Sequence, residues 1–248
     1  GFDGDKTPPK VISFNLNLAQ GTVSIVFDEP VNAATFDLTE MTLWQPSGAE
    51  YKITTTVTLT GFSNSIAASF SSDDLNNIKA NTDLATAKHD SYLAVGNIVQ
   101  DTSNNLCLGL AKSESLQVTS YTYDATKPLL QSWELDLNDN TMTLIFDETV
   151  DGSSVVFERI TIMSPTTTSK RQLSGLTGNF KAPGTQLTFT LNADDVNAIQ
   201  LFTDLAVSED TTYIELEDTA VIDMREAPAN GIAKVVKKVG KLTTDSTA

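Results

Sequence analysis

Apolar and polar residues alternate along most of this chain of 248 residues. Two alternating runs stand near its start, separated by Gln20-Gly21, and their apolar positions are Ile12, Phe14, Leu16 and Leu18, then Val23, Ile25 and Phe27. A period of two places every second side chain on the same face of a β-strand. The pattern predicts two short antiparallel strands joined by a turn.

The same pattern returns 119 residues later, when residues 5–9 are aligned with residues 124–128. Residues 23–29 (VSIVFDE) then align with residues 142–148 (MTLIFDE). After a further shift of two residues, the segments that align are 73–76 with 194–197 and 82–85 with 203–206. Matches in this order indicate an internal repeat. We therefore predict two domains, residues 1–123 and residues 124–248.

The last residues of the chain resemble the start of the second repeat. Residues 243–247 (TTDST) are similar to residues 122–126 (TYDAT). We therefore expect residues 243–248 to begin a further repeat, and the chain to be a piece of a longer array.

Each repeat of about 120 residues holds some seven short alternating segments, which is typical of an antiparallel two-sheet β-sandwich. Residues 72–78 (SDDLNNI) interrupt the alternation with a helical pattern, in which Ser72 is the expected N-cap and two acids occupy the first turn. The fold class is therefore predicted as all-β, with a short helical turn between the fifth and sixth strands of the repeat.

Three motifs in this order resemble a known domain family. They are an opening Asp-x-Thr-x-Pro (residues 5–9 and 124–128), Phe-Asp-Glu-Pro-Val (27–31), and a late segment YLAVGNIVQDTSNN (92–105). The combination is similar to the Ig-like domain first described in bacterial surface-layer proteins, which occurs in tandem in large cell-surface and adhesin-like polypeptides. The second repeat departs from it at Thr149, in the place of Pro30, and at residues 221–225, which lack the asparagines of residues 101–105.

The resemblance implies two tandem Ig-like antiparallel β-sandwich domains without an activity of their own. It also implies an extracellular or cell-surface location. Neighbouring repeats of the same polypeptide would be the main partners, with surface proteins or glycans as further ones.

Composition excludes several other classes. The chain has 16 Lys and Arg against 32 Asp and Glu, a formal net charge of −16, which repels nucleic acids and anionic membranes. No apolar run approaches the roughly 18 residues of a membrane span, so direct membrane insertion is not expected. A single cysteine and a single histidine exclude an internal disulfide, a cysteine zinc cluster and a multi-histidine metal site.

Carboxylates are the candidate functional residues. The ends of the second and sixth strands should return to the pole where each repeat begins, and this predicts two groups of acids: Asp5, Asp28, Glu29 and Asp101 in repeat one, and Asp124, Asp147, Glu148 and Asp223 at the junction. Converging carboxylates suit Ca²⁺, which takes six to eight oxygen ligands. The alternatives are turn-capping and solvated acids, or the paired carboxylates of a glycosidase, for which a sandwich pole offers no sugar-binding cleft.

The other reactive side chains favour packing or exposure. Cys107, between Leu106 and Leu108, is expected to be a buried or half-buried thiol, and His89 lies in a polar stretch that predicts an exposed loop. Trp133 aligns with core-facing Phe14, whereas Trp44 is open to packing or to an exposed contact. A basic stretch at Lys234, Lys237, Lys238 and Lys241 is either a solvated edge strand or a contact for an acidic neighbour.

The leading hypothesis is therefore a non-catalytic structural or adhesive spacer of a large surface protein. The main alternative is a carbohydrate- or protein-binding module, and a hydrolase is a third reading.

Overall fold

The computed structural model describes residues 4–166, 168–178, 180–224 and 230–245. The chain divides into two compact units, Gly1–Ala125 and Thr126–Ala248. The division falls two residues after the boundary that the sequence repeat suggested. Each unit contains two β-sheets, so the all-β class predicted from the alternation is confirmed at this level.

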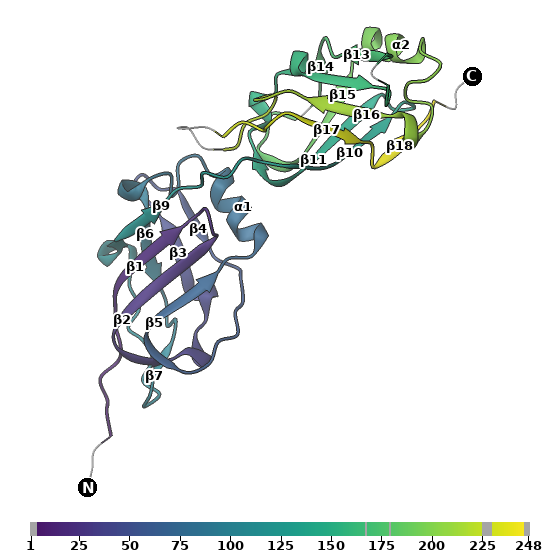
Figure 1. The fold of residues 1–248 in the computed structure, drawn as a ribbon. Coiled ribbons are helices and arrows are strands. Elements are labelled where there is room, and N and C mark those ends of the chain that lie inside the picture. Colours follow the sequence, from purple (N-terminus) through teal and green to yellow (C-terminus); the bar gives the residue numbers. More distant parts are fainter. Residues whose placement is uncertain (1–3, 167, 179, 225–229, 246–248) are drawn as a thin grey trace. The chain divides into compact units, whose positions relative to one another are not determined.

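The first unit is built from two sheets that share one apolar core. One sheet has the strand order β5 (Phe62–Ser69), β2 (Thr22–Asn32), β1 (Val11–Asn17) and β9 (Ser120–Thr122), with β7 (Gln100–Asp101) also paired to β2 (Figure 1). The other sheet has the order β4 (Glu50–Lys52), β3 (Met41–Trp44), β6 (Tyr92–Val95) and β8 (Leu116–Gln117). All pairs are antiparallel except β1 with β9.

The second unit repeats the order of the main strands, but it has one more edge strand and a single bridge, Val150 with Asp223, in place of β7. Its first sheet has the order β14 (Leu176–Thr177), β15 (Gly184–Leu191), β11 (Thr141–Val150), β10 (Leu130–Asp136) and β18 (Lys241–Thr243). The second sheet has the order β13 (Lys170–Gln172), β12 (Ile160–Met163), β16 (Tyr213–Leu216) and β17 (Val235–Lys238). The β10 and β18 strands pair in parallel, as β1 and β9 do. The sequence repeat is therefore also a structural repeat.

Alternating side chains form the cores, which makes each unit β-sandwich-like. In the first unit Phe14, Ile25 and Phe27 from one sheet are fully buried with Leu43 and Leu93 from the other. In the second unit the corresponding buried side chains are Trp133, Leu144, Phe146, Ile162 and Ile214. Full burial of one such side chain stabilises a fold by about 1.5–3 kcal/mol.

In the described ranges each unit has one α-helix: α1 (Ser72–Ala80) follows β5 in the chain, and α2 (Ala193–Gln200) follows β15. The order agrees with the sequence expectation, but α1 is longer than the single turn predicted and begins one residue earlier. Its N-cap is Ser71, whose hydroxyl accepts a hydrogen bond from the Asp74 amide, rather than Ser72. The short 3-10 turns of both units are η1 (Ala33–Thr35), η2 (Leu38–Glu40), η3 (Lys88–Asp90), η4 (Lys112–Glu114), η5 (Gly152–Ser154), η6 (Phe157–Arg159) and η7 (Glu209–Thr211).

A shift of register bends the second strand of each unit. In β2 the pairing with β5 is interrupted between Val26 and Val31, and in β11 the pairing with β15 is interrupted between Ile145 and Val150. Such interruptions re-aim side chains at a strand end. The acidic dipeptides Asp28-Glu29 and Asp147-Glu148 lie inside the two interruptions. In the described ranges, no helix has the length and apolar character needed to cross a membrane.

Candidate functional site

Three of the predicted acids of repeat one lie together. One carboxylate oxygen from each of Asp5, Glu29 and Asp101 lies within 4.8 Å of the other two. Two oxygens that each bind Ca²⁺ at about 2.4 Å are at most ~4.8 Å apart, so the spacing fits one ion held by all three. The side chains range from exposed Asp5 through half-buried Glu29 to buried Asp101.

Asp28 is outside this group because its carboxylate has a structural role. Its Oδ1 accepts a hydrogen bond from the Lys10 amide at 2.7 Å, and its own amide donates to the Lys10 carbonyl at 3.0 Å. Asp147 makes the same pair of contacts with Leu129, at 2.7 Å and 3.1 Å. Both aspartates thus close the end of the first strand onto the second.

Asp101 is held in a tight turn. Its Oδ1 accepts hydrogen bonds from the Ser103 amide at 2.7 Å and the Asn105 amide at 2.8 Å, and its Oδ2 accepts one from the Asn105 side chain at 2.7 Å. Burial raises the pKa of Asp101, but the hydrogen bonds from Asn105 and Ser103 outweigh it and keep the pKa below its ordinary value. The Asp101 carboxylate is therefore held in a fixed position and favoured in its ionised form.

Glu29 has a raised pKa. Burial is the largest cause, and the negative charges of Asp5, Asp101 and Asp28 add to it. The ionised form of Glu29 is thus disfavoured by its neighbours, which is the electrostatic situation that a bound cation relieves.

The second unit repeats the Asp101 turn with a different spacing. Asp223 bridges to Val150 as Asp101 pairs with Val31. Asn230 takes the place of Asn105: its amide donates to Asp223 Oδ1 at 3.2 Å and its side chain donates to Asp223 Oδ2 at 2.9 Å. The sequence comparison missed this asparagine because it lies seven residues after the aspartate instead of four. Of the other residues of that predicted group, Asp147 and Glu148 also belong to the second unit, and Glu148 is buried.

Asp124 belongs to the first unit and forms a buried ion pair with Lys79, at the end of α1. The corresponding aspartate after the second repeat, Asp245, accepts a hydrogen bond from Gln200, at the end of α2, at 3.0 Å. Residues 79 and 200 occupy the same position in the two helices. In both units, the eighth residue of the helix therefore holds an aspartate that lies two residues after the last strand of the unit.

A buried carboxylate anchors each helix, and the sequence pattern did not reveal it. Asp74 of α1 accepts hydrogen bonds from the Tyr51 hydroxyl at 2.8 Å, the Thr54 hydroxyl at 2.7 Å and the Thr55 amide at 2.7 Å, besides the Thr55 hydroxyl. Burial raises its pKa, but the hydrogen bonds from Thr55, Thr54 and Tyr51 together keep the pKa below its ordinary value. Asp74 thus ties α1 to the segment that follows β4.

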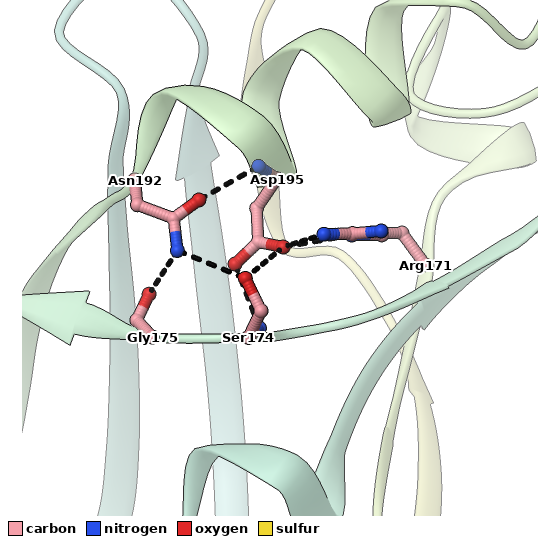
Figure 2. Close-up of polar contacts among 5 residues, drawn as sticks. All are labelled: Arg171, Ser174, Gly175, Asn192 and Asp195. Carbon is pink, nitrogen blue, oxygen red and sulfur yellow. Dashed lines mark hydrogen bonds and ion pairs between the residues drawn. The ribbon is translucent and has the colours of Figure 1, made fainter.

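The same anchor in the second unit uses different chemistry (Figure 2). Asp195 accepts hydrogen bonds from Arg171 Nε at 2.7 Å and from the Ser174 amide and hydroxyl at 2.9 Å and 3.0 Å. The Asn192 cap reaches from the helix start to the Ser174 hydroxyl and the Gly175 carbonyl, at 3.0 Å and 3.3 Å. Arg171 stands where the first unit has Tyr51. A cation therefore compensates the buried charge in only one of the two described anchors.

Trp44 is half-buried and lies at the end of β3, in the second sheet of the first unit. Its ring centroid lies 5.8 Å from that of Tyr92, and the Lys112 ammonium lies 6.0 Å from its centroid, held there by an ion pair with Glu50. Within the described residues the indole Nε1 is buried without a hydrogen-bond partner. Tyr92 and Lys112 therefore both contribute to the packing of the Trp44 ring.

The other predicted residues occupy the expected environments. Cys107 is buried, and burial together with the charge of Asp28 raises the pKa of its thiol to about 11, so the thiol is unreactive. His89 is exposed, in a 3-10 turn. Trp133 is fully buried and its indole donates to the Lys237 carbonyl at 3.0 Å, which confirms its packing role.

The basic stretch lies on and beside strand β17. Lys234 pairs with Glu215 at 3.0 Å, and Lys238 pairs with Asp210. Two of the four lysines thus find their acidic partners within the same unit, on the sheet edge that β17 forms. This favours the solvated-edge interpretation of the stretch.

Comparison with known proteins gives no family. No family model matches the chain, and no curated protein matches it. One similar solved structure is the N-terminal part of the bacterial S-layer protein SbsC, at 11% sequence identity and a TM-score of 0.28. The alignment covers 94% of this chain but 44% of that one, so this chain spans less than half of its length. At this TM-score the likeness supports no argument about fold or function.

Proposed function

We propose that this chain is a non-catalytic spacer: a pair of tandem Ig-like β-sandwich domains of a larger extracellular or cell-surface repeat protein, with a structural or adhesive role. The observation that carries this proposal is that the second unit repeats the order of the main strands of the first, together with the helix and its buried carboxylate. Repeated units that each have a core of their own are suited to an array in which every unit adds length.

Site chemistry supports the same reading. The thiol is buried with a high pKa, and the histidine is exposed on a turn. Of the acids of the first pole, Asp28 and Asp101 accept hydrogen bonds from backbone amides. An enzyme of the glycosidase type needs two carboxylates facing each other across a cleft that holds the sugar. Neither Asp28 nor Asp101 is placed for that task, because each is engaged in closing a turn.

Mechanical unfolding tests the spacer role. The two units contain 125 and 123 residues, so each should lengthen the chain by roughly 400 Å when it unfolds. Pulling the whole chain by its ends in an optical trap should therefore give two separate steps of nearly equal size. A single step, or gradual extension without steps, would contradict a series of independent load-bearing domains. Turnover of a glycoside, ester or peptide substrate that one carboxylate substitution abolishes would contradict the absence of catalysis.

The spacer is proposed to bind Ca²⁺ at the pole formed by Asp5, Glu29 and Asp101. Support comes from the 4.8 Å spacing of their oxygens and from the raised pKa of Glu29 among like charges.

Calcium titration tests this proposal. A ligand that binds only the folded state at 100 times its Kd stabilises that state by about 2.7 kcal/mol, which raises the melting temperature by several degrees. Glu29→Gln should reduce this rise, because it removes one of the three carboxylates of the site. Asp83→Asn, which removes an exposed acid elsewhere, is the control. Identical melting curves in calcium and in chelator would mean that these acids are ordinary turn and surface residues.

A further inference from the structure

The outer edge of strand β5 is unusual among the sheet edges of the first unit. It is eight residues long, carries no charged side chain, and no described residue pairs with it on the side away from β2. The other outer strands are shorter, and β4 carries Glu50 and Lys52. Proteins usually protect long edges with charges, prolines or a covering segment, because an open edge can pair with another chain. Residues 58–60 flank this edge without a ladder to it, so in the described part of the chain its backbone groups face a groove that is suited to accept a strand.

A groove follows this edge. It has a volume of about 370 Å³ and is lined on one side by β5 and on the other by residues 58–60. The lining includes Thr58, Thr60, Ser63, Ser65, Ile66 and Ala67, none of which is charged. The volume is within the range of ligand-binding pockets, about 300–1,000 Å³.

The far wall of the groove is fixed at both of its ends. The buried Asp74 holds Thr54 and Thr55 at one end, and the Gly61 carbonyl accepts a hydrogen bond from the Ala33 amide at 2.9 Å at the other. Between these points the segment makes no ladder with β5, although residues 54–60 (TTTVTLT) alternate like a strand and Val57 and Leu59 pack against the core. The groove is therefore held open by the fold.

The same groove recurs in the second unit. There it has a volume of about 460 Å³ and lies between β15 and the segment after β14, with a lining that again holds no charged residue. The strand β14 pairs with β15 only at Leu191 and Thr190, which leaves the rest of that edge beside the groove. Because the groove lies at the same place in both units, we regard it as a regular feature of this fold.

We propose that this groove binds an extended, uncharged segment of a partner polypeptide, which adds to β5 as a further strand. Backbone N–H and C=O groups along the edge supply the affinity, since strand addition pairs main chains. Charge matching selects the occupant: the chain has 48 charged residues, yet the walls of both grooves are neutral, so a charged strand would lose its hydration without gaining a partner. The inference does not depend on the spacer role, because a spacer works with the groove empty.

A peptide-binding experiment tests the proposal. The probe is a fluorescent synthetic peptide of the sequence TTTVTLT, an uncharged strand-forming heptapeptide, titrated with the whole chain. Saturable binding is expected, together with slowed hydrogen exchange of the amides of residues 63–69. A second peptide, with lysines in place of two threonines, should bind about tenfold more weakly or not at all.

Two matched variants locate the site. Ser65→Lys places a charge on the groove wall and should weaken binding at least about tenfold, whereas Asn64→Lys adds the same charge on the same strand outside the lining and should not. Equal melting temperatures of both variants and the parent chain exclude loss of folding as the cause. Absence of saturable binding, equal binding of the charged peptide, or equal effects of the two lysines would overturn the proposal. So would self-association abolished by Ser65→Lys, which would assign the edge to a second copy.

Discussion

Single carboxylates decide how the helices are held. Asp74 is buried and receives hydrogen bonds from Tyr51, Thr54 and Thr55, without a cation beside it in any contact described above. Asp74→Asn keeps the shape but turns an acceptor into a donor that faces other donors. We expect it to lower the free energy of unfolding of the first unit by roughly 2–4 kcal/mol. Chemical denaturation measures this, with the exposed neighbour Asp73→Asn as a control that should cost under about 1 kcal/mol.

The same carboxylate predicts a pH dependence. In the unfolded chain an aspartate has a pKa near 3.9, and in the fold the pKa of Asp74 is lower. The unfolded state therefore binds the proton first as the pH falls. The stabilisation is fully present above about pH 4 and is lost as the pH falls through the folded pKa. Denaturation at several values between pH 2 and 5 measures this: the free energy of unfolding should change less with pH for Asp74→Asn than for the parent chain. An equal pH dependence of the two would contradict the prediction.

At the scale of elements, the two units differ in the turn after the second strand. Ala33 begins η1, whereas Gly152 begins η5 at the equivalent place. A Cβ on Gly152 would lie 1.8 Å from the Phe180 carbonyl oxygen and 2.8 Å from that of Ala182. The backbone of the groove wall thus approaches more closely in the second unit than an alanine allows.

Gly152→Ala should therefore destabilise the second unit by about 1–3 kcal/mol, because the wall has to move away from the turn. The reciprocal change Ala33→Gly leaves space in the first unit and should cost only about 1 kcal/mol, chiefly in backbone entropy. Thermal melting of the two single variants compares these costs directly. If Gly152→Ala lowered the melting temperature no more than Ala33→Gly, the backbone at Phe180 and Ala182 would be able to move aside without a cost in stability.

At the scale of the whole molecule, we expect each unit to fold and unfold cooperatively by itself. Each has its own core, so residues 1–125 and residues 126–248, expressed separately, should each unfold in one cooperative transition. Circular dichroism and calorimetry of the two fragments measure this. A fragment that remains unfolded until the other is added would show that the units depend on each other for folding.

The sequence predicted regular features well and irregular ones poorly. Alternation identified the strands around Phe14 and Ile25 and their partners one repeat later, because burial of one face imposes a period of two. It did not reveal Asp74, since an acid in a first helical turn has an ordinary explanation in the helix dipole. Asn230 was missed because a loop of different length carries the same contact. Residues 54–60 have a strand pattern but no ladder, because pairing depends on the neighbouring chain and not on the pattern.

The contacts of Asp124 and Asp245 have a consequence for how such a chain can be rearranged. The second sequence repeat begins at Asp124, yet Asp124 is held by Lys79 from the helix of the first repeat, and Asp245 is held in the same way by Gln200 of α2. The boundary of the sequence repeat and the boundary of the folded unit therefore differ by a few residues. Recombination that exchanges whole sequence repeats between related proteins would therefore separate an aspartate such as Asp124 from its partner side chain, Lys79. Among related sequences, the residue at position 79 should therefore covary with residue 124, at the start of the second repeat, rather than with residue 5, at the start of the first.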